Sequence, residues 1–409
     1  MPNTRTQIAS RGTTFTNAFV TTPLCCPSRS SILTGTYAHN HGVRNNDDGV
    51  ESVLDPRSTV ERYLHDAGYR TAMFGKLLNG WPIGLSLPYF DRWAFIPRVS
   101  DGAFCNGLWN VNGRVRVVSQ YSTAFINRQA VAFLKGNEAR DDSRPWFLFL
   151  ATPAPHLPAT PEAKYSDAPV PASPEDPASD EHDRSDKPAY VAAGSLDAYA
   201  DAAQDYRQQM LRSLMSVDDM VGSLFRTLRS DHEARDTLVV FLSDNGFLFG
   251  QHGLVGKAAP YSGSIGVPMV LRWPGHVAAG ATDPRIAANI DIAPTILQAA
   301  GIEADPGYPV DGRSLLEPST RTRLLTEFWK IDDYFVPSWA SLRTRTFQYI
   351  EYYTENGSIT YREYYNLVRD PDQLVNVLGD SDASNDPSDL GSLHDRLTHD
   401  RTCVGSACP

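Results

Sequence analysis

Two adjacent cysteines near the start of the chain lie in a motif whose spacing selects one of them. Residues 23–35 read PLCCPSRSSILTG, and Cys25 has a proline two residues later and an arginine, Arg29, four residues later. Cys26 has neither residue at those spacings. A cysteine side chain can act as the nucleophile in covalent catalysis, in which an attacking side chain divides one difficult step into two. The alternative is a pair of buried structural thiols, a common role of free cysteines.

Other side chains suited to chemistry follow predicted strands. Lys76 comes two residues after one strand, His156 follows the next in TPAPHLP, and Asp244 and Asn245 follow a third in SDNG. Open α/β sheets bind ligands beyond the carboxyl ends of their strands, so these residues are expected to share a site. Histidine suits proton transfer near neutral pH, and a carboxylate with an amide oxygen suits calcium. Each also has a plainer interpretation, as a solvated lysine, a loop histidine and a turn.

The elements that position these residues alternate along the chain. Residues Thr59–Ala67 are predicted as a helix ended by Gly68, and Tyr69–Phe74 as a strand. The continuous apolar runs Trp146–Ala151 and Leu238–Leu242 are typical of buried strands. Apolar residues at helical spacing over Met210–Leu228 predict a long helix. The pattern indicates an α/β fold with a large, mostly parallel central sheet flanked by helices.

The last part of the chain is expected to form a smaller antiparallel sheet. Two aromatic-rich strands surround Asn356-Gly357, which is a strong hairpin signal. We therefore predict a catalytic domain over residues 1–325 and an α+β subdomain over 326–409. Residues 162–194 are rich in Pro, Asp, Ser and Ala, and are predicted to form a surface insertion with mobility of its own.

Composition excludes two classes of partner. The chain has 409 residues and is 41% hydrophobic, which is enough to bury the large core of a globular protein. Its formal net charge is -11. Acidic character without a Lys/Arg-rich run argues against nucleic-acid binding. No apolar stretch approaches the length of a membrane span.

The cysteines near the C-terminus and the residues at the N-terminus give information on whether the protein is secreted. Cys403 and Cys408 are spaced for a small disulfide loop, which would suit an oxidising environment, although two free thiols remain the alternative. The first residues, MPNTRTQIASRG, lack the apolar core of a signal peptide.

The combined motifs resemble the type I sulfatases of the alkaline phosphatase-like superfamily. The resemblance extends over nearly the whole chain and is carried by the pentad from Cys25 to Arg29, by TYAHNHGVRNN after it, by TPAPHLP and by VRDPDQLVNV near the C-terminus. Within the family the chain looks like the N-acetylglucosamine-6-sulfatase branch. The resemblance implies hydrolysis of sulfate esters on sulfated sugars or glycosaminoglycan fragments, and an extracellular location.

The resemblance also assigns roles to individual residues. It implies that a formylglycine-generating enzyme oxidises Cys25 to formylglycine, whose hydrate supplies one hydroxyl to attack sulfur and another to expel sulfate. Arg29 is expected to hold this group, Lys76 and Lys257 to contact the sulfate, and His156 to protonate the leaving oxygen. The remaining roles are calcium binding by Asp244, Asn245 and residue 25, and substrate binding by His252 and Asn46. Arg44 and Asn45 are within reach of a sugar, as Asn46 is, and His39 and His41 are expected near the helix that carries the motif. The alternative for each of these five residues is a capping or surface role.

One departure from the family keeps three hypotheses open. Sulfatases begin with a strand ending in an Asp-Asp pair that binds calcium, whereas the 24 residues before Cys25 contain no Asp or Glu. The chain resembles a family member that starts after that strand. The hypotheses are a sulfatase, a phosphate or phosphonate monoester hydrolase on the same scaffold, and a truncated glycan-binding homologue without activity.

Overall fold

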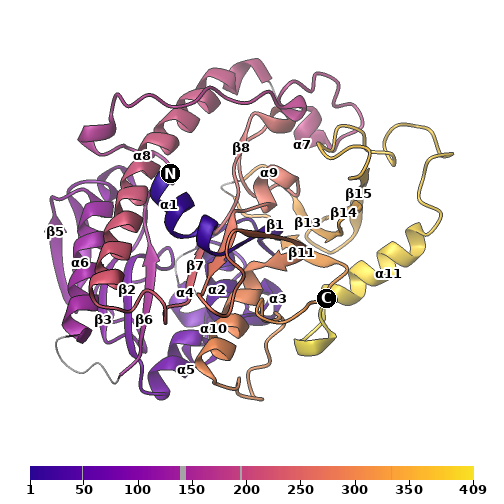
Figure 1. Cartoon of the computed structure of the whole chain (residues 1–409). Coiled ribbons are helices and arrows are strands. Elements are labelled where there is room, and N and C mark those ends of the chain that lie inside the picture. The colour runs from indigo at the N-terminus through magenta and orange to yellow at the C-terminus, as the bar shows by residue number, and fades with distance from the viewer. Residues whose placement is uncertain (48, 139–143, 194–195, 333) are drawn as a thin grey trace.

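Two mixed sheets form the centre of the larger part of the molecule (Figure 1). The computed structural model describes all residues except 48, 139–143, 194–195 and 333. The first sheet has the order β5-β4-β3-β2-β6 and the second the order β11-β1-β10-β7. The strands are β1 Thr13–Phe19, β2 Arg70–Lys76, β3 Arg92–Ile96, β4 Gly107–Val111, β5 Arg114–Val118, β6 Trp146–Ala151, β7 Val239–Leu242, β10 Met269–Arg272 and β11 Ala281–Ala288.

Strand direction is mixed within both sheets. β2 runs parallel to β3 and β6, and β1 runs parallel to β11. In contrast, β4 pairs antiparallel with β3 and β5, and β10 pairs antiparallel with β1 and β7. The expected α/β architecture is confirmed, with antiparallel strands added where the sequence predicted mostly parallel ones.

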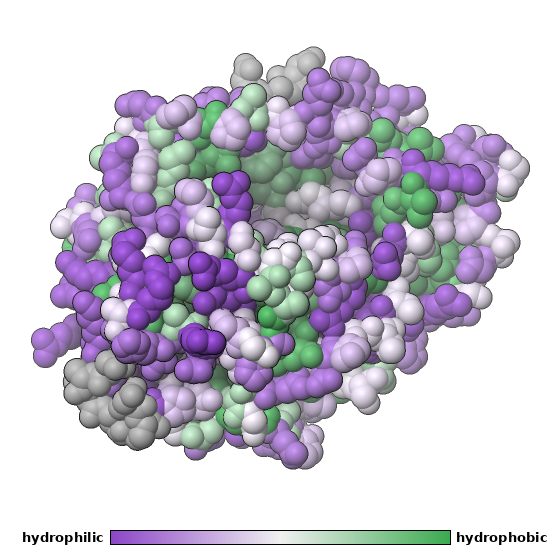
Figure 2. Space-filling view, in the orientation of Figure 1, coloured by the Kyte–Doolittle hydropathy of each residue, from purple (hydrophilic) through white to green (hydrophobic). Residues whose placement is uncertain are grey.

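Helices cover the sheets on both faces. Alternate residues of β2 point to opposite sides, so Phe74 packs with Phe125 and Phe225 of one helical layer, while Met73 packs with Leu64 and Leu297 of the other. The helices are α1 Pro2–Gln7, α2 Cys25–Thr34, α3 Ala38–His41, α4 Val50–Val53, α5 Val60–Asp66, α6 Ser122–Glu138, α7 Ala189–Ala192, α8 Leu196–Ser230, α9 Ser262–Ile265, α10 Ile292–Ala300 and α11 Leu390–Asp400. Figure 2 shows polar residues over most of one face, with apolar residues in scattered groups.

A separate antiparallel sheet forms near the C-terminus. Its strands β12 Leu324–Phe328, β13 Ser338–Arg343, β14 Phe347–Tyr353 and β15 Ile359–Asn366 pair in sequence order. The turn between β14 and β15 contains Gly357 at φ 83°, a conformation that glycine adopts without strain. The predicted hairpin is therefore confirmed. β12 spans the predicted domain boundary between residues 325 and 326.

The remaining strands, β8 Leu248–Phe249 and β9 Val255–Gly256, pair with each other as a short antiparallel ribbon.

The predicted insertion over residues 162–194 is attached to the rest of the protein near Glu181 and Lys187. Most of it is exposed, but Glu181 and Lys187 are buried, with their carboxylate and ammonium groups 3.1 Å apart. Lys187 also donates to the carbonyl of Leu374 beyond β15. Buried charges are stable only when paired in this way, so this part of the insertion is fixed to the C-terminal sheet.

Candidate active site

Cys25 is the first residue of α2, at the helix end where backbone N–H groups point outward. β1 leads into this helix, and Gly35 in the left-handed conformation ends it at φ 73°. The Asn46 amide oxygen accepts the Cys26 N–H at 2.8 Å and so caps one free donor. A helix N-terminus stabilises negative charge on its first residues. Cys25 is one of these residues in α2.

Lysines surround the Cys25 thiol. Lys257 Nζ lies 2.9 Å from Cys25 Sγ and 3.1 Å from the Asn245 amide oxygen. Lys76, the last residue of β2, is buried and acts electrostatically on the same sulfur. Burial opposes ionisation of the thiol, but Lys257 and Lys76 outweigh it and lower the pKa of Cys25 well below its usual range. The site therefore stabilises negative charge at residue 25.

Arg29 links the helix to the ends of two strands. Its Nε donates to Asp244 Oδ2 at 2.7 Å, two residues beyond β7, and its guanidinium also donates to the carbonyl of Lys76. Burial disfavours the Asp244 carboxylate, yet Arg29, Lys76 and Lys257 together hold the pKa of Asp244 well below its usual range. The pair fixes α2, β2 and β7 against one another.

His156 approaches Cys25 from the loop after β6. Its Nδ1 lies 2.6 Å from the Leu157 carbonyl, and because a carbonyl only accepts, Nδ1 carries a proton. The side chain also helps to lower the pKa of Cys25, so it lies beside the sulfur. Nε2 is therefore the nitrogen left to gain or release a proton beside residue 25.

The two cysteines have different surroundings. Cys26 Sγ accepts the Asn79 N–H at 3.0 Å and packs in the apolar cluster that contains Leu33 and Met73. Burial raises the pKa of Cys26 to about 12. Cys26 is thus a neutral core thiol, whereas Cys25 faces the cations, as the motif spacing suggested.

Several residues expected near a substrate are occupied elsewhere. His252 is buried, with Nδ1 2.8 Å from Glu181 Oε2 and its ring 4.2 Å from that of Tyr261. His41 lies 3.1 Å from Ser31 Oγ, and burial lowers its pKa to about 3. These contacts give both histidines a structural environment, and a substrate role for His252 stays a prediction.

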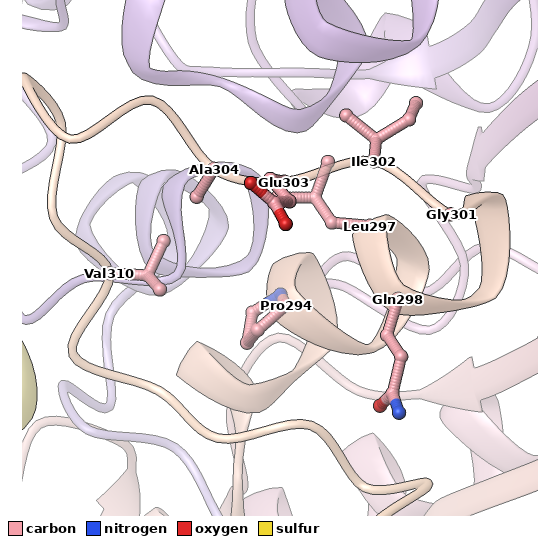
Figure 3. Close-up of a pocket in the computed structure, with 8 residues that line it drawn as sticks. All are labelled: Pro294, Leu297, Gln298, Gly301, Ile302, Glu303, Ala304 and Val310. Carbon is pink, nitrogen blue, oxygen red and sulfur yellow. The ribbon is translucent and has the colours of Figure 1, made fainter.

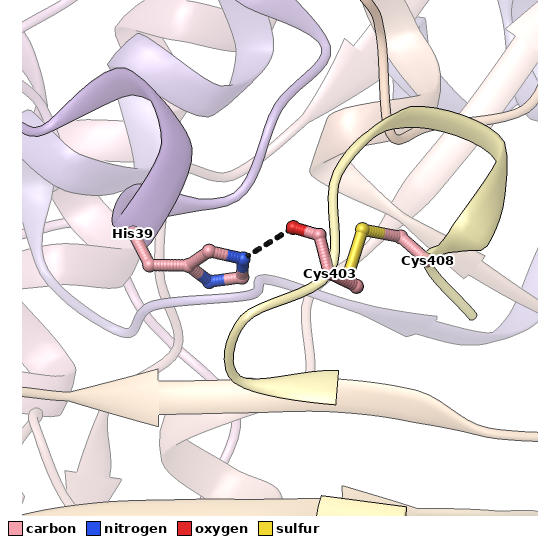
Figure 4. Close-up of side chains that lie close together, drawn as sticks. All are labelled: His39, Cys403 and Cys408. Carbon is pink, nitrogen blue, oxygen red and sulfur yellow. Dashed lines mark hydrogen bonds between the residues drawn. A yellow bond between two sulfur atoms is a disulfide. The ribbon is translucent and has the colours of Figure 1, made fainter. Parts of the chain in front are cut away.

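His39 is likewise engaged in the protein (Figure 4). Its Nδ1 lies 2.9 Å from Glu327 of β12, and Nε2 lies 3.0 Å from the Cys403 carbonyl. Cys403 and Cys408 form a disulfide, which is the pairing that their spacing suggested. Both ring nitrogens of His39 are therefore engaged with the C-terminal part of the chain. Asn46 caps α2, and its contact with a substrate stays a prediction.

The residues present do not by themselves fit a calcium ion. Calcium takes about six to eight oxygen ligands. Beside Cys25, the described residues that were predicted as ligands are Asp244 and Asn245, whose side chains offer three oxygens. Asp244 Oδ2 already accepts from Arg29, and the Asn245 amide oxygen already accepts from Lys257. The ligand atoms of His39, Cys403 and Cys408 lie within 4.8 Å of one another, but the disulfide removes both thiols as ligands.

A surface hollow is lined by residues of α10 and of the chain that follows it (Figure 3). No residue predicted for catalysis lines it, so it is not the candidate active site. Its lining residues are Pro294, Leu297, Gln298, Gly301, Ile302, Glu303, Ala304 and Val310.

The helices in the described part of the chain include none with the length and apolar character of a membrane span.

Some contacts at the site were not anticipated. Asn79, which holds Cys26, and Glu181, which holds His252, lie outside the motifs. Tyr334 acts electrostatically on Lys257 from the segment after β12. Its sequence context, FWKIDDYFVPSW, has a high density of aromatic residues, and this was the available signal.

The chain matches two family models. The Sulfatase model covers residues 1–302, and the model described as N-sulphoglucosamine sulphohydrolase, C-terminal, covers residues 250–401. The chain is 29% identical to human N-acetylglucosamine-6-sulfatase over 469 aligned positions, which cover 100% of this chain and 82% of the human protein. It is 34% identical to an extracellular sulfatase Sulf-1 homolog of Caenorhabditis elegans, covering 78% of this chain and 46% of that protein. The chain thus spans less than half the length of this relative.

Comparison of structures supports the same fold. A protein solved in complex with its substrate D-glucosamine-2-N,6-O-disulfate superposes with a TM-score of 0.78 at 24% identity, covering 97% of this chain and 91% of the other. At that identity the likeness shows the fold alone. Since the Sulfatase model matches well over half of the residues, the chain belongs to the sulfatase family.

Proposed function

We propose that this protein hydrolyses sulfate monoesters on sulfated sugars or glycosaminoglycan fragments, with residue 25 as the nucleophile. The observation that carries the proposal is the position of Cys25 at the N-terminus of α2, with Lys257 at 2.9 Å and Lys76 and Arg29 around it. This arrangement concentrates positive charge in a protein whose net charge is -11. A sulfate ester needs such a site, because negative charge accumulates on its oxygens in the transition state.

Residue 25 is proposed to act as formylglycine, produced by a formylglycine-generating enzyme. In that form it would supply a hydrated aldehyde as nucleophile. The side chains of Lys257 and Lys76 bind the sulfate oxygens, and Arg29 orients the helix that carries residue 25. His156 is proposed to deliver the Nε2 proton to the leaving oxygen, since Nδ1 is held by the Leu157 carbonyl.

Calcium has no assigned step in this proposal. Asp244 and Asn245 are the residues that the family resemblance connects with the metal, but their three side-chain oxygens, two of which already accept from Arg29 and Lys257, fall short of its needs. Adding calcium and then a chelator to the purified protein, with thermal unfolding and turnover as readouts, tests this. Stabilisation by calcium would show that the chain completes the site with other groups.

The substrate class rests on similarity to N-acetylglucosamine-6-sulfatase over the entire chain. An extracellular location is part of the proposal, supported by the extracellular relative and the Cys403–Cys408 disulfide.

Turnover of glucosamine 6-sulfate and 4-nitrophenyl sulfate by protein co-expressed with a formylglycine-generating enzyme tests the function. Cys25→Ala should abolish turnover, whereas Cys26→Ala is the matched control and should retain it. A clear preference for 4-nitrophenyl phosphate would favour a phosphate monoester hydrolase. Absence of turnover, with binding of the sulfated sugar retained, would favour the inactive homologue.

A further inference from the structure

The segment between β12 and β13 forms an anchored loop next to the active site. Tyr334 N donates to the Ile331 carbonyl at 3.1 Å, and the Tyr334 ring packs edge-on against Phe328 with centroids 6.3 Å apart. At its far end, Trp339 Nε1 donates at 2.7 Å to the carbonyl of Ala258, the residue after Lys257. The loop is therefore tied to the same stretch of chain that carries the catalytic lysine.

Two independent contacts connect this loop to the charged site. The Tyr334 phenol lies close enough to Lys257 to act on it electrostatically. On another side, the Arg44 guanidinium lies over the Trp329 ring, 4.8 Å from its centroid. Arg44 precedes by two residues Asn46, whose amide oxygen binds the Cys26 backbone. Trp329 and Arg44 thus adjoin the segment that caps the nucleophile helix.

The loop exposes groups suited to an anionic sugar. Phe335 is 97% exposed, the highest value among the large apolar side chains that the structure describes as exposed. An aromatic face attracts the C–H groups of a pyranose ring, whose hydrogens are weakly positive. Arg44 is exposed as well, and its planar guanidinium can bind a sulfate or carboxylate through two parallel hydrogen bonds.

We propose that Arg44, Trp329 and Phe335 form a subsite for the second sugar of a sulfated oligosaccharide, whose first sugar carries the ester bound at residue 25. The inference rests on the proposed function and extends it from a single sulfated sugar to a chain. Trp329 and Phe335 provide apolar faces, and Arg44 provides the charge that a neighbouring sulfate or uronate requires. The proposal predicts that longer substrates are preferred.

The test compares two substrates of different length. The ratio of kcat/KM for a 6-O-sulfated heparan tetrasaccharide to kcat/KM for glucosamine 6-sulfate is measured for the wild type and for Arg44→Ala, Trp329→Ala and Phe335→Ala. The ratio is expected to fall by about tenfold in each variant, corresponding to about 1.4 kcal/mol. Asp332→Ala, at an exposed position of the same loop, is the control and should keep the ratio.

Two outcomes would overturn the subsite. Either the ratio stays at the wild-type value in all three variants, or both substrates lose the same factor, which would place these residues at the first sugar. Phe335 and Arg44 are exposed, so their variants keep the test valid if Trp329→Ala does not fold. If the wild type hydrolyses neither substrate, the proposed function fails. The tetrasaccharide Kd, measured by calorimetry, then decides the subsite: about tenfold weaker binding in the variants supports it and unchanged binding refutes it.

Discussion

Replacing Lys257 by methionine should raise the pKa of the Cys25 thiol in protein that has not been converted to formylglycine. The lysine ammonium lies 2.9 Å from the sulfur, and Coulomb's law with an effective dielectric constant of about 20 gives a gross attraction of about 6 kcal/mol. Burial of the thiolate offsets part of this. A single opposite charge at such a distance shifts a pKa by about 1–3 units, or about 1.4–4 kcal/mol.

The assay follows alkylation of Cys25 by iodoacetamide as a function of pH, with peptide mass spectrometry separating Cys25 from Cys26. In the wild type, the midpoint of the alkylation rate is expected well below the ordinary thiol pKa of about 8.5, because the neighbouring lysines lower the pKa of Cys25. In Lys257→Met the rate should rise with pH, with its midpoint about 1–3 units higher. Lys164→Met, which removes an ammonium paired with Asp219 on the surface, is the matched control.

This reasoning would be refuted if Cys25 in the wild type titrated near the ordinary thiol pKa of about 8.5. It would also be refuted if Lys257→Met left the midpoint where it was. Either result would mean that the lysine does not stabilise negative charge at residue 25, and the electrostatic basis of the proposed function would be lost.

Three further results are expected. Arg29→Met should lower the free energy of unfolding by about 2–4 kcal/mol in urea, because it leaves the Asp244 carboxylate, 22% exposed, without its partner; a loss below about 1 kcal/mol would contradict this. His156→Gln should slow hydrolysis of glucosamine 6-sulfate by about 10²–10⁴-fold and that of 4-nitrophenyl sulfate much less, because nitrophenolate leaves without a proton; equal losses would exclude the proton-donor role. Although burial disfavours the charged imidazole, Glu327 raises the pKa of His39. The stabilisation from this charge is present below the unfolded pKa of about 6.5 and is lost as pH rises through the higher folded value. Glu327→Gln should therefore destabilise the protein by about 1 kcal/mol more at about pH 6 than at about pH 9 in urea titrations, and an equal cost at both pH values would contradict it.

The convergence of site residues was accessible from sequence because it follows a geometric rule. Lys76 ends β2, His156 follows β6 and Asp244 follows β7, and the structure brings all three to the N-terminus of α2. Apolar runs predicted the strands, and the carboxyl-end rule of open sheets predicted where their following residues meet. The choice of Cys25 over Cys26 came from the resemblance of the pentad to the sulfatase motif, which only Cys25 fits.

Other features depended on contacts between distant parts of the chain. His252 is held by Glu181, a residue 71 positions away, in a segment whose composition suggested mobility. His39 is held by Glu327 and by the Cys403 carbonyl, 288 and 364 positions away. Strand direction was also out of reach, since an apolar run such as that of β10 is the same for a parallel and an antiparallel strand.

The state of residue 25 is the most direct test of the central claim. Protein co-expressed with a formylglycine-generating enzyme should yield a tryptic peptide in which residue 25 has lost its sulfur while Cys26 keeps its own, and the same preparation should hydrolyse glucosamine 6-sulfate. An unaltered thiol at residue 25 in protein that nevertheless turns over this substrate, or a fully converted residue without any turnover, would contradict the proposed function.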